Sequence, residues 1–130
     1  MTRVAFLVAL LLALSAGAAQ ARGDDHGGSG GEARVAGTCS RGATASLRLR
    51  GDDGAIEVRF RLRQNRGRGP WRITVVHERR VASRATRRTT RGNRSVELER
   101  TLPDLEGSDE VVVRAWGPRG LGCHAAATLR

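Results

Sequence analysis

Apolar and charged residues alternate along most of this chain, and the alternation is clearest in the segment 55–63, AIEVRFRLR. A period of two places the apolar residues on one face of a β-strand and the charged residues on the other. A helix would instead mix the two kinds of residue on every face. One buried and one solvated face is typical of antiparallel sheets. We therefore expect 55–63 to be a central strand of an antiparallel sheet.

The same alternation predicts further short strands, separated by turn sequences at fairly regular spacing. They are expected at 34–39, 44–50, 71–77, 95–102, 111–115 and 123–129. Asp53-Gly54 is a strong hairpin signal and joins two of them. The segment 78–92 is ambiguous. In a weak edge strand guarded by arginines, Val81, Ser83 and Ala85 would face inward. Seven or eight such strands predict an all-β, antiparallel β-sandwich.

The first part of the chain predicts export. Arg3 precedes an apolar run at 4–14, which is short for a membrane span, and Ala19-Gln20-Ala21 resembles a cleavage site. We expect a signal peptide at 1–21, a flexible Gly-rich leader at 22–32 and a β-sandwich domain at 33–130. A signal anchor is the alternative to the signal peptide. The expected location is secreted and extracellular, with association with the cell wall as a second possibility.

Two cysteines, Cys39 and Cys123, lie in the expected first and last strands. An oxidising location favours one disulfide bond between them, which would join the two ends of the domain. A reduced or an intermolecular pair is the alternative. In the predicted leader, Asp24, Asp25 and His26 have the right chemistry for metal ligands, but they lack a fourth donor nearby. We therefore predict no metal site and no cofactor.

The chain carries a formal net charge of +10, and all of its basic residues are arginine. Loss of Arg3 with the signal peptide lowers this charge to +9. Such an excess favours anionic partners, among them cell-wall polymers, acidic glycans, nucleic acid and anionic membrane surfaces. The guanidinium group binds phosphate and carboxylate through two parallel hydrogen bonds. The candidate anion-binding residues are Arg59, Arg61, Arg63, Arg72, Arg79, Arg80, Arg84, Arg87, Arg88, Arg91 and Arg94.

Two interpretations of these arginines stay open. Seven of them, between Arg79 and Arg94, form a ridge without any acid, which Arg59, Arg61, Arg63 and Arg72 would join to make one binding surface. Alternatively, they form a solvated edge in an arginine-rich composition. Specific recognition of nucleic acid is not expected, because it needs several stacking aromatic residues. Trp116 has outward parity beside a turn, and it is either an exposed contact residue or a cap over the end of the sandwich.

Catalytic residues are not evident, and the chain is not expected to be an enzyme. His77 is expected to be partly buried at a strand end, and His124 faces outward. Neither is placed with a nucleophile in a triad pattern. Asp52, Asp53, Asp109 and Glu110 lie at turns and corners, where carboxylates are common. The predicted function is a non-enzymatic binding or cell-envelope-associated module for anionic polymers. A secreted hydrolase or enzyme inhibitor is the alternative, and the oligomeric state stays open.

Two further features carry a resemblance over residues 34–130. Trp71 begins the strand after the first hairpin, and the segment 102–115, LPDLEGSDEVVVRA, leads into the penultimate strand. In both respects the chain resembles immunoglobulin-like and fibronectin-type-III-like domains, which implies an immunoglobulin-like sandwich. It departs from them in lacking a tyrosine at that corner, where Asp109 stands nearby, and in carrying its cysteines on terminal strands. The layout also resembles small secreted proteins of high-GC Gram-positive bacteria.

Overall fold

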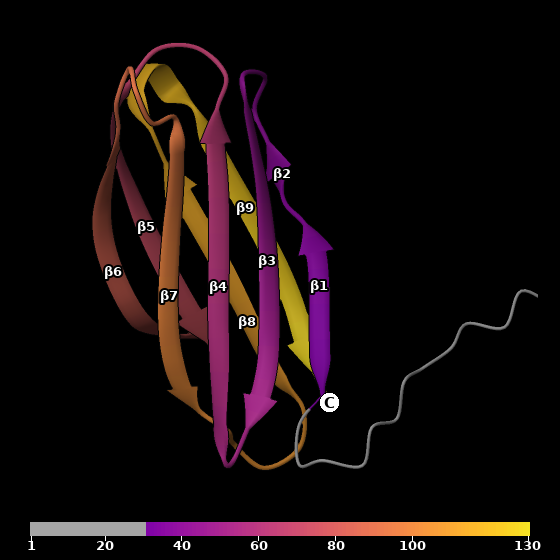
Figure 1. Cartoon of the computed structure of the whole chain (residues 1–130). Coiled ribbons are helices and arrows are strands. Elements are labelled where there is room, and N and C mark those ends of the chain that lie inside the picture. Colours follow the sequence, from indigo (N-terminus) through magenta and orange to yellow (C-terminus); the bar gives the residue numbers. More distant parts are fainter. Residues whose placement is uncertain (1–30) are drawn as a thin grey trace, which may run out of the picture.

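The computed structural model describes residues 31–130, which form two antiparallel β-sheets packed face to face (Figure 1). The predicted signal peptide at 1–21, the leader up to residue 30 and its Asp24, Asp25 and His26 lie outside the described residues. The strands are β1 (Glu32–Ala36), β2 (Thr38–Cys39), β3 (Ala43–Asp52), β4 (Ala55–Gln64), β5 (Gly69–His77), β6 (Arg80–Thr89), β7 (Ser95–Pro103), β8 (Asp109–Trp116) and β9 (Gly122–Leu129). A short 3-10 helix, η1 (Pro118–Gly120), joins the last two. The predicted all-β antiparallel sandwich is confirmed, with nine strands in the described part instead of seven or eight.

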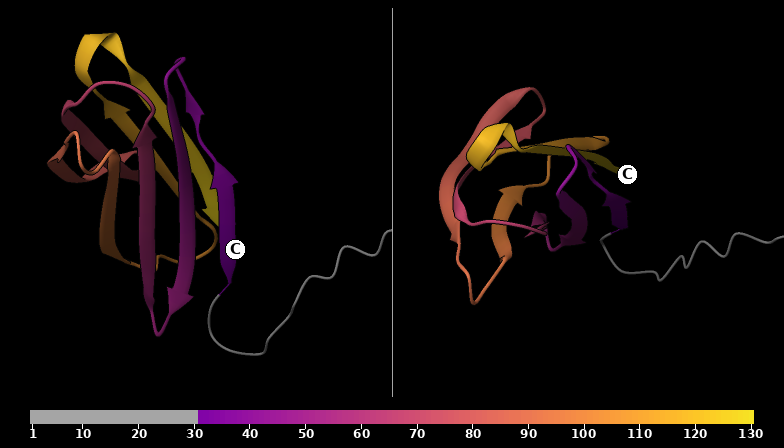
Figure 2. Two further views of the ribbon diagram at one scale, coloured as in Figure 1. Left: turned by 45° about the horizontal axis from the view of Figure 1, so that its top comes forward. Right: turned by 90° about the horizontal axis from the view of Figure 1, so that it is seen from above.

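One sheet has the strand order β1-β3-β4-β7, and the other has the order β2-β9-β8-β5-β6 (Figure 2). We call them the four-stranded and the five-stranded sheet. The strand β4 pairs with β3 on one side and with β7 on the other, so its predicted central position is confirmed. The turn between β3 and β4 consists of Asp53 and Gly54, both with positive φ, as a two-residue hairpin of type I′ requires.

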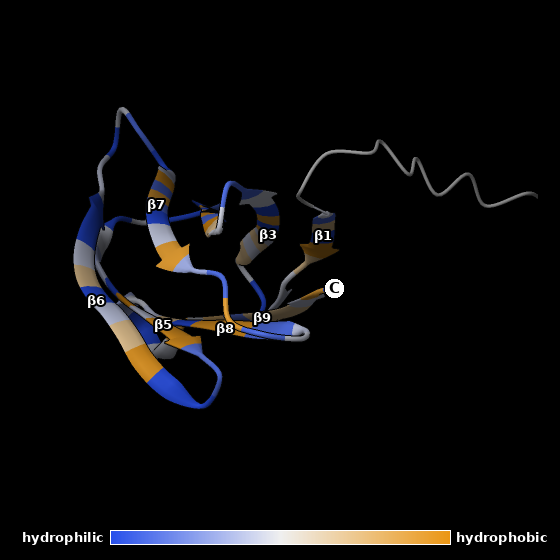
Figure 3. Cartoon of the chain, turned by 90° about the horizontal axis from the view of Figure 1, so that it is seen from below, coloured by the Kyte–Doolittle hydropathy of each residue, from blue (hydrophilic) through white to orange (hydrophobic). Residues whose placement is uncertain are grey.

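The core lies between the two sheets and consists of the apolar residues that the alternation assigned to the inner faces. Hydrophobic and hydrophilic bands accordingly alternate along the strands (Figure 3). The largest fully buried apolar side chains are Trp71, Phe60, Leu47, Leu49, Ile56, Leu62, Ile73, Leu98, Val75, Val111 and Val113. The backbone at Gly117 lies directly on the indole of Trp71, since a Cβ atom added there would be 2.5 Å from the ring. At this end of the sandwich the core is therefore covered by the backbone of Gly117 and not by a side chain.

The predicted single strand at 34–39 is wrong, because the chain changes sheets within it. The strand β1 pairs with β3 in the four-stranded sheet, whereas β2 pairs with β9 in the five-stranded sheet. The crossing point is Gly37, whose amide donates to the carbonyl of Ala45 at 2.8 Å. A Cβ atom at Gly37 would be 2.9 Å from the Cβ of Ala45, so only glycine allows this approach.

The ambiguous segment 78–92 contains β6, which forms an edge of the five-stranded sheet and carries several arginines, as expected of a protected edge. Ser83 and Ala85 are partly buried, but the predicted inward position of Val81 is wrong, since 48% of its surface is exposed. The cause is a register shift between Val75 and Val76 in the pairing with β6, which reverses the parity of the strand beyond it.

The predicted disulfide bond between Cys39 and Cys123 is confirmed. These two residues are direct cross-strand partners in β2 and β9, and the bond therefore joins the first part of the domain to the last strand within one sheet. It does not connect the two sheets. A disulfide bond is compatible with the predicted extracellular location.

Candidate anion-binding site

Four connections between strands gather at one end of the sandwich, the upper end in Figure 1. In an antiparallel arrangement successive connections alternate between the two ends, so every second one lies at the same end. The four are 40–42, 65–68, 90–94 and 117–121. Each of them contains an Arg-Gly dipeptide or leads out of one. We call this set of connections the arginine-loop end, and the right-hand view of Figure 2 looks down on it.

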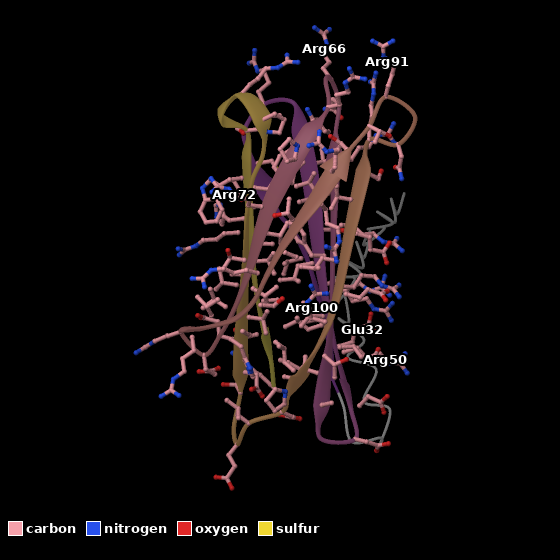
Figure 4. All side chains as sticks on the ribbon, turned by 90° about the vertical axis from the view of Figure 1, so that its left-hand side faces the viewer. Glu32, Arg50, Arg66, Arg72, Arg91 and Arg100 are labelled. Carbon is pink, nitrogen blue, oxygen red and sulfur yellow. A yellow bond between two sulfur atoms is a disulfide. The ribbon has the colours of Figure 1, made fainter. Side chains whose placement is uncertain are left out.

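All arginines of the arginine-loop end are exposed. They are Arg41, Arg66, Arg68, Arg91, Arg94 and Arg119. The side chains of Arg66 and Arg91 extend outward at the tip of the molecule (Figure 4). Within residues 31–130, no carboxylate pairs with any of the six. Their positive charge is therefore not neutralised by neighbours in the described part of the chain.

Carboxylates lie elsewhere, most of them at the opposite end. That end holds the turns between β3 and β4 and between β5 and β6, and the connection between β7 and β8. The carboxylates in or beside these three connections are Asp52, Asp53, Glu78, Asp104, Glu106, Asp109 and Glu110. The other acids of the described chain are Glu32, Glu57, Glu97 and Glu99, on the outer face of the four-stranded sheet. The sandwich is thus polarised along its length, and its field attracts anions to one end.

Backbone hydrogen bonds hold the loops of the arginine-loop end to one another. The amide of Asn65 donates to the carbonyl of Gly42 at 2.8 Å, and the amide of Gln64 donates to the carbonyl of Arg94 at 2.9 Å. The guanidinium of Arg94 donates in turn to the carbonyl of Asn65 at 2.7 Å. Three of the four connections are therefore joined directly. Such fixed loops lose less conformational entropy on binding than free ones.

A buried polar cluster supports these loops from below. The indole Nε1 of Trp71 donates to Oε1 of Gln64 at 3.0 Å, and the hydroxyl of Thr89 lies 2.7 Å from the same oxygen. The amide nitrogen of Gln64 donates to the carbonyl of Arg66 at 2.8 Å. Gln64 and Thr89 are each only 1% exposed. The cluster thus connects the core tryptophan to the loop 65–68 and fixes its conformation.

The arginines predicted from the sequence do not form one surface, and the expected union of the ridge with the strand arginines is wrong. Their side chains alternate between faces that belong to different sheets. Arg59, Arg61 and Arg63 lie on the outer face of the four-stranded sheet, and Arg72, Arg84 and Arg88 lie on the outer face of the five-stranded sheet. Arg87 lies at the exposed edge of β6. Arg79 and Arg80 lie at the carboxylate-rich end, and Arg91 and Arg94 lie at the arginine-loop end.

Two of the strand arginines are already paired with acids. Arg59 lies 2.7 Å from a carboxylate oxygen of Glu99, and Arg61 lies 3.1 Å from one of Glu97. Both glutamates are on β7, directly across from the arginines in the register of the sheet. This part of the face is a ladder of opposite charges, in which Arg59 and Arg61 each have a carboxylate partner. It is less available to an outside anion than the arginine-loop end.

Trp116 is 49% exposed and projects from the outer face of the five-stranded sheet. Its interpretation as a cap is wrong, because the Gly117 backbone covers the core at this point.

His124 is exposed on the same face, opposite Arg114. His77 is 7% exposed, as its inward parity predicted.

Asp109 is not an ordinary corner carboxylate, because it is 1% exposed and bound to His77. Its Oδ1 lies 2.7 Å from Nε2 of His77 and accepts a hydrogen bond from the amide of Leu105 at 3.2 Å. Burial by itself raises the pKa of Asp109, but the hydrogen bonds with His77, Asp104 and Leu105 outweigh it and hold the pKa below its ordinary value of 3.8. The pair ties the start of β8 to the end of β5.

This pair predicts a loss of stability in acid. Since the pKa of Asp109 is lower in the folded chain than in the unfolded one, its contribution to the free energy of unfolding is complete above about pH 4 and is lost as the pH falls further. The hydrogen bond with Asp109 raises the pKa of Asp104, which offsets part of this loss. Asp109→Asn is expected to cost about 1 to 3 kcal/mol at pH 7. Urea unfolding of both proteins between pH 7 and pH 3 should show this difference shrinking as the pH falls. An equal difference at every pH would contradict the assignment.

The arginine-loop end was missed in the sequence because its six arginines are scattered over four connections. Only Arg91 and Arg94 were among the predicted candidates. The signal was available, since each of the four connections carries an Arg-Gly dipeptide and alternate connections of an antiparallel sandwich share an end. The sequence prediction instead favoured the single segment 79–94, where arginines are dense.

The chain matches no protein-family model, no curated protein and no solved structure at a significant level. Within residues 31–130, no helix is long and apolar enough to cross a membrane. The same residues contain no group of three or more His, Cys, Asp or Glu side chains arranged to hold a metal ion. The assignment of function therefore depends on the geometry of the site.

Proposed function

We propose that this chain is a secreted, non-enzymatic binding module that holds anionic polymers, such as those of a cell envelope, at the arginine-loop end. The observation that carries the proposal is the gathering of six exposed arginines from four connected loops, with every described carboxylate elsewhere. An extended polymer with repeated negative charges fits a surface whose positive charges are spread over several loops.

The chemistry of the guanidinium group favours polymers that carry phosphate or carboxylate groups. Each guanidinium offers a planar set of donors that pairs with two oxygens of one anion. Because the six groups are exposed, each contact is weak by itself, and affinity comes from several contacts to one polymer. The buried cluster around Gln64 supports this use, since it holds the loop 65–68 in place before the polymer arrives.

The fold that presents these loops is proposed to be immunoglobulin-like. Support comes from the buried Trp71 on β5, the strand that follows the β3–β4 hairpin and lies in the opposite sheet, and from the first part of the domain pairing with both sheets through β1 and β2. The disulfide within one sheet is a departure from that pattern.

The proposal predicts strongly salt-dependent binding. The purified protein should co-sediment with isolated cell walls and bind soluble polyphosphate at about 50 mM salt, with affinity for polyphosphate falling at least about tenfold by roughly 200 mM. The reason is that binding releases the counterions condensed on the polymer. Titration at several salt concentrations, with a neutral dextran as the control polymer, measures this. Binding that is absent at low salt, or unchanged by salt, would overturn the proposal.

A further inference from the structure

A second surface begins beside the arginine-loop end, on the outer face of the five-stranded sheet. It is a shallow groove across β8, β5 and β6, and its side chains are Trp116, Arg72, Thr86, Thr74 and Arg84. Arg72, on the middle strand of the three, is labelled in Figure 4. We call this groove across β8, β5 and β6 the tryptophan groove. It is distinct from the ion-paired face of the four-stranded sheet.

The register of the strands orders these side chains in two rows. Trp116 is the cross-strand partner of Arg72, which is the partner of Thr86. In the next row, Arg114 is the partner of Thr74, which is the partner of Arg84. Each row therefore combines a guanidinium with a hydroxyl, and neighbouring strands are about 5 Å apart. The groove spans roughly 10 Å across three strands, about the length of two sugar rings.

The Trp116 side chain is open to a ligand over about half of its surface. On β9, the partner of Trp116 is Gly122, which has no side chain to cover the ring. Almost half of the Trp116 surface is exposed, the highest value among the large hydrophobic side chains of the described residues. A flat, open indole offers an apolar platform of the kind on which the C–H face of a pyranose ring stacks.

We propose that the tryptophan groove binds the sugar rings of an acidic polysaccharide. One pyranose stacks on Trp116, its carboxylate or sulfate pairs with Arg72 or Arg84, and ring hydroxyls bond to Thr74 and Thr86. The inference deepens and rests on the proposed function, since Trp116 precedes the loop 117–121 and the polymer held at the arginine-loop end continues directly into the groove. It adds a preference for polymers built of sugar rings over other polyanions.

The chemistry of the groove favours a polysaccharide over single-stranded nucleic acid. Nucleic-acid surfaces stack successive bases on several aromatic side chains, and this groove has one. Its two hydroxyls stand next to guanidinium groups, which matches a ligand that carries hydroxyls and anions on the same ring.

The test compares two polyanions, oligogalacturonate and polyphosphate, of which only the first has sugar rings. Trp116→Ala is expected to weaken binding of oligogalacturonate by at least about tenfold, a typical cost of losing one stacked ring, and to change the affinity for polyphosphate less than about twofold. Val81→Ala, at a site of similar exposure on the same face, is the matched control and should change neither affinity. Trp116→Phe, which keeps an aromatic ring, should recover part of the loss.

Fluorescence gives an independent readout, because Trp71 is buried and Trp116 is exposed. Oligogalacturonate should protect the exposed tryptophan from acrylamide quenching, and polyphosphate should not. The inference is overturned if Trp116→Ala leaves oligogalacturonate binding unchanged, or if a single-stranded oligothymidylate binds more tightly than oligogalacturonate and depends equally on Trp116. If either result is found while the wild-type protein still binds polyphosphate in a salt-dependent way, the proposed function stands and only the tryptophan groove is excluded. If the wild-type protein binds no polyanion at all, both the proposed function and the tryptophan groove are overturned.

Discussion

Removal of the disulfide bond by Cys39→Ala and Cys123→Ala together is expected to lower the free energy of unfolding by about 3 kcal/mol. The bond joins residues 84 positions apart, so it encloses most of the domain. In the chain-entropy model a loop of this length accounts for about 4 to 5 kcal/mol, and measured effects are commonly smaller. Urea unfolding of the double variant, compared with the wild-type protein, measures the difference.

The effect should be concentrated at β2. This strand has two residues and pairs with β9 through two residue pairs, one of which is the disulfide itself. Next to it, the amide and hydroxyl of Ser40 bind the carbonyl of Gly122, and these bonds hold the start of the loop 40–42. Without the disulfide, we expect β2 to separate from the sheet and Arg41 to lose its fixed position.

Reduction of the wild-type protein provides the control. A reducing agent should lower the stability of the wild-type protein to that of the double variant and should leave the variant unchanged. A loss below about 1 kcal/mol, or the same response to reductant in both proteins, would contradict the role given to the disulfide.

The fold was predictable from the sequence because the inner faces of both sheets follow a strict period of two. Leu47, Phe60 and Val113 each lie on the face that the alternation indicated. The errors arose where a contact between distant segments decides the structure. The change of sheet at Gly37 depends on its approach to Ala45, and the exposure of Val81 depends on a register shift in the pairing of β5 with β6. Neither contact leaves a periodic signal.

The candidate site was harder to predict than the fold. Alternation tells which residues face outward, but it does not tell which sheet a strand joins, and so Arg61 and Arg72 were expected on one surface although they lie on different sheets. The burial of Asp109 was missed for a related reason. A carboxylate at a strand end is normally solvated, and only the pairing of β5 with β8 brings His77 next to it.

The second large effect concerns the arginine-loop end. We expect a variant with Arg66, Arg68, Arg91 and Arg119 replaced by Gln to bind polyphosphate about 100-fold more weakly than the wild-type protein. If each exposed arginine contributes about 0.7 kcal/mol, within the range of surface ion pairs, four contribute about 2.8 kcal/mol, which corresponds to roughly 100-fold in affinity. Because all four side chains are exposed and the strands are unchanged, the free energy of unfolding should stay within about 1 kcal/mol of the wild-type value.

A matched control separates the place of the charges from their number. Its four substitutions to Gln remove the same net charge from exposed positions near the other end of the sandwich. They are Arg50, Arg79, Arg80 and Arg130. Since these arginines are far from the proposed contact, the control should lose less than about threefold in affinity at moderate salt, where charges more than about 10 Å away are screened.

The most direct test of the central claim is therefore the dissociation constant for polyphosphate, measured by titration calorimetry at about 100 mM salt for the wild-type protein and both variants. We expect a loss of about 100-fold for the arginine-loop variant and a nearly unchanged affinity for the control. Equal losses in the two variants would show that only net charge matters and would contradict the assignment of binding to the arginine-loop end.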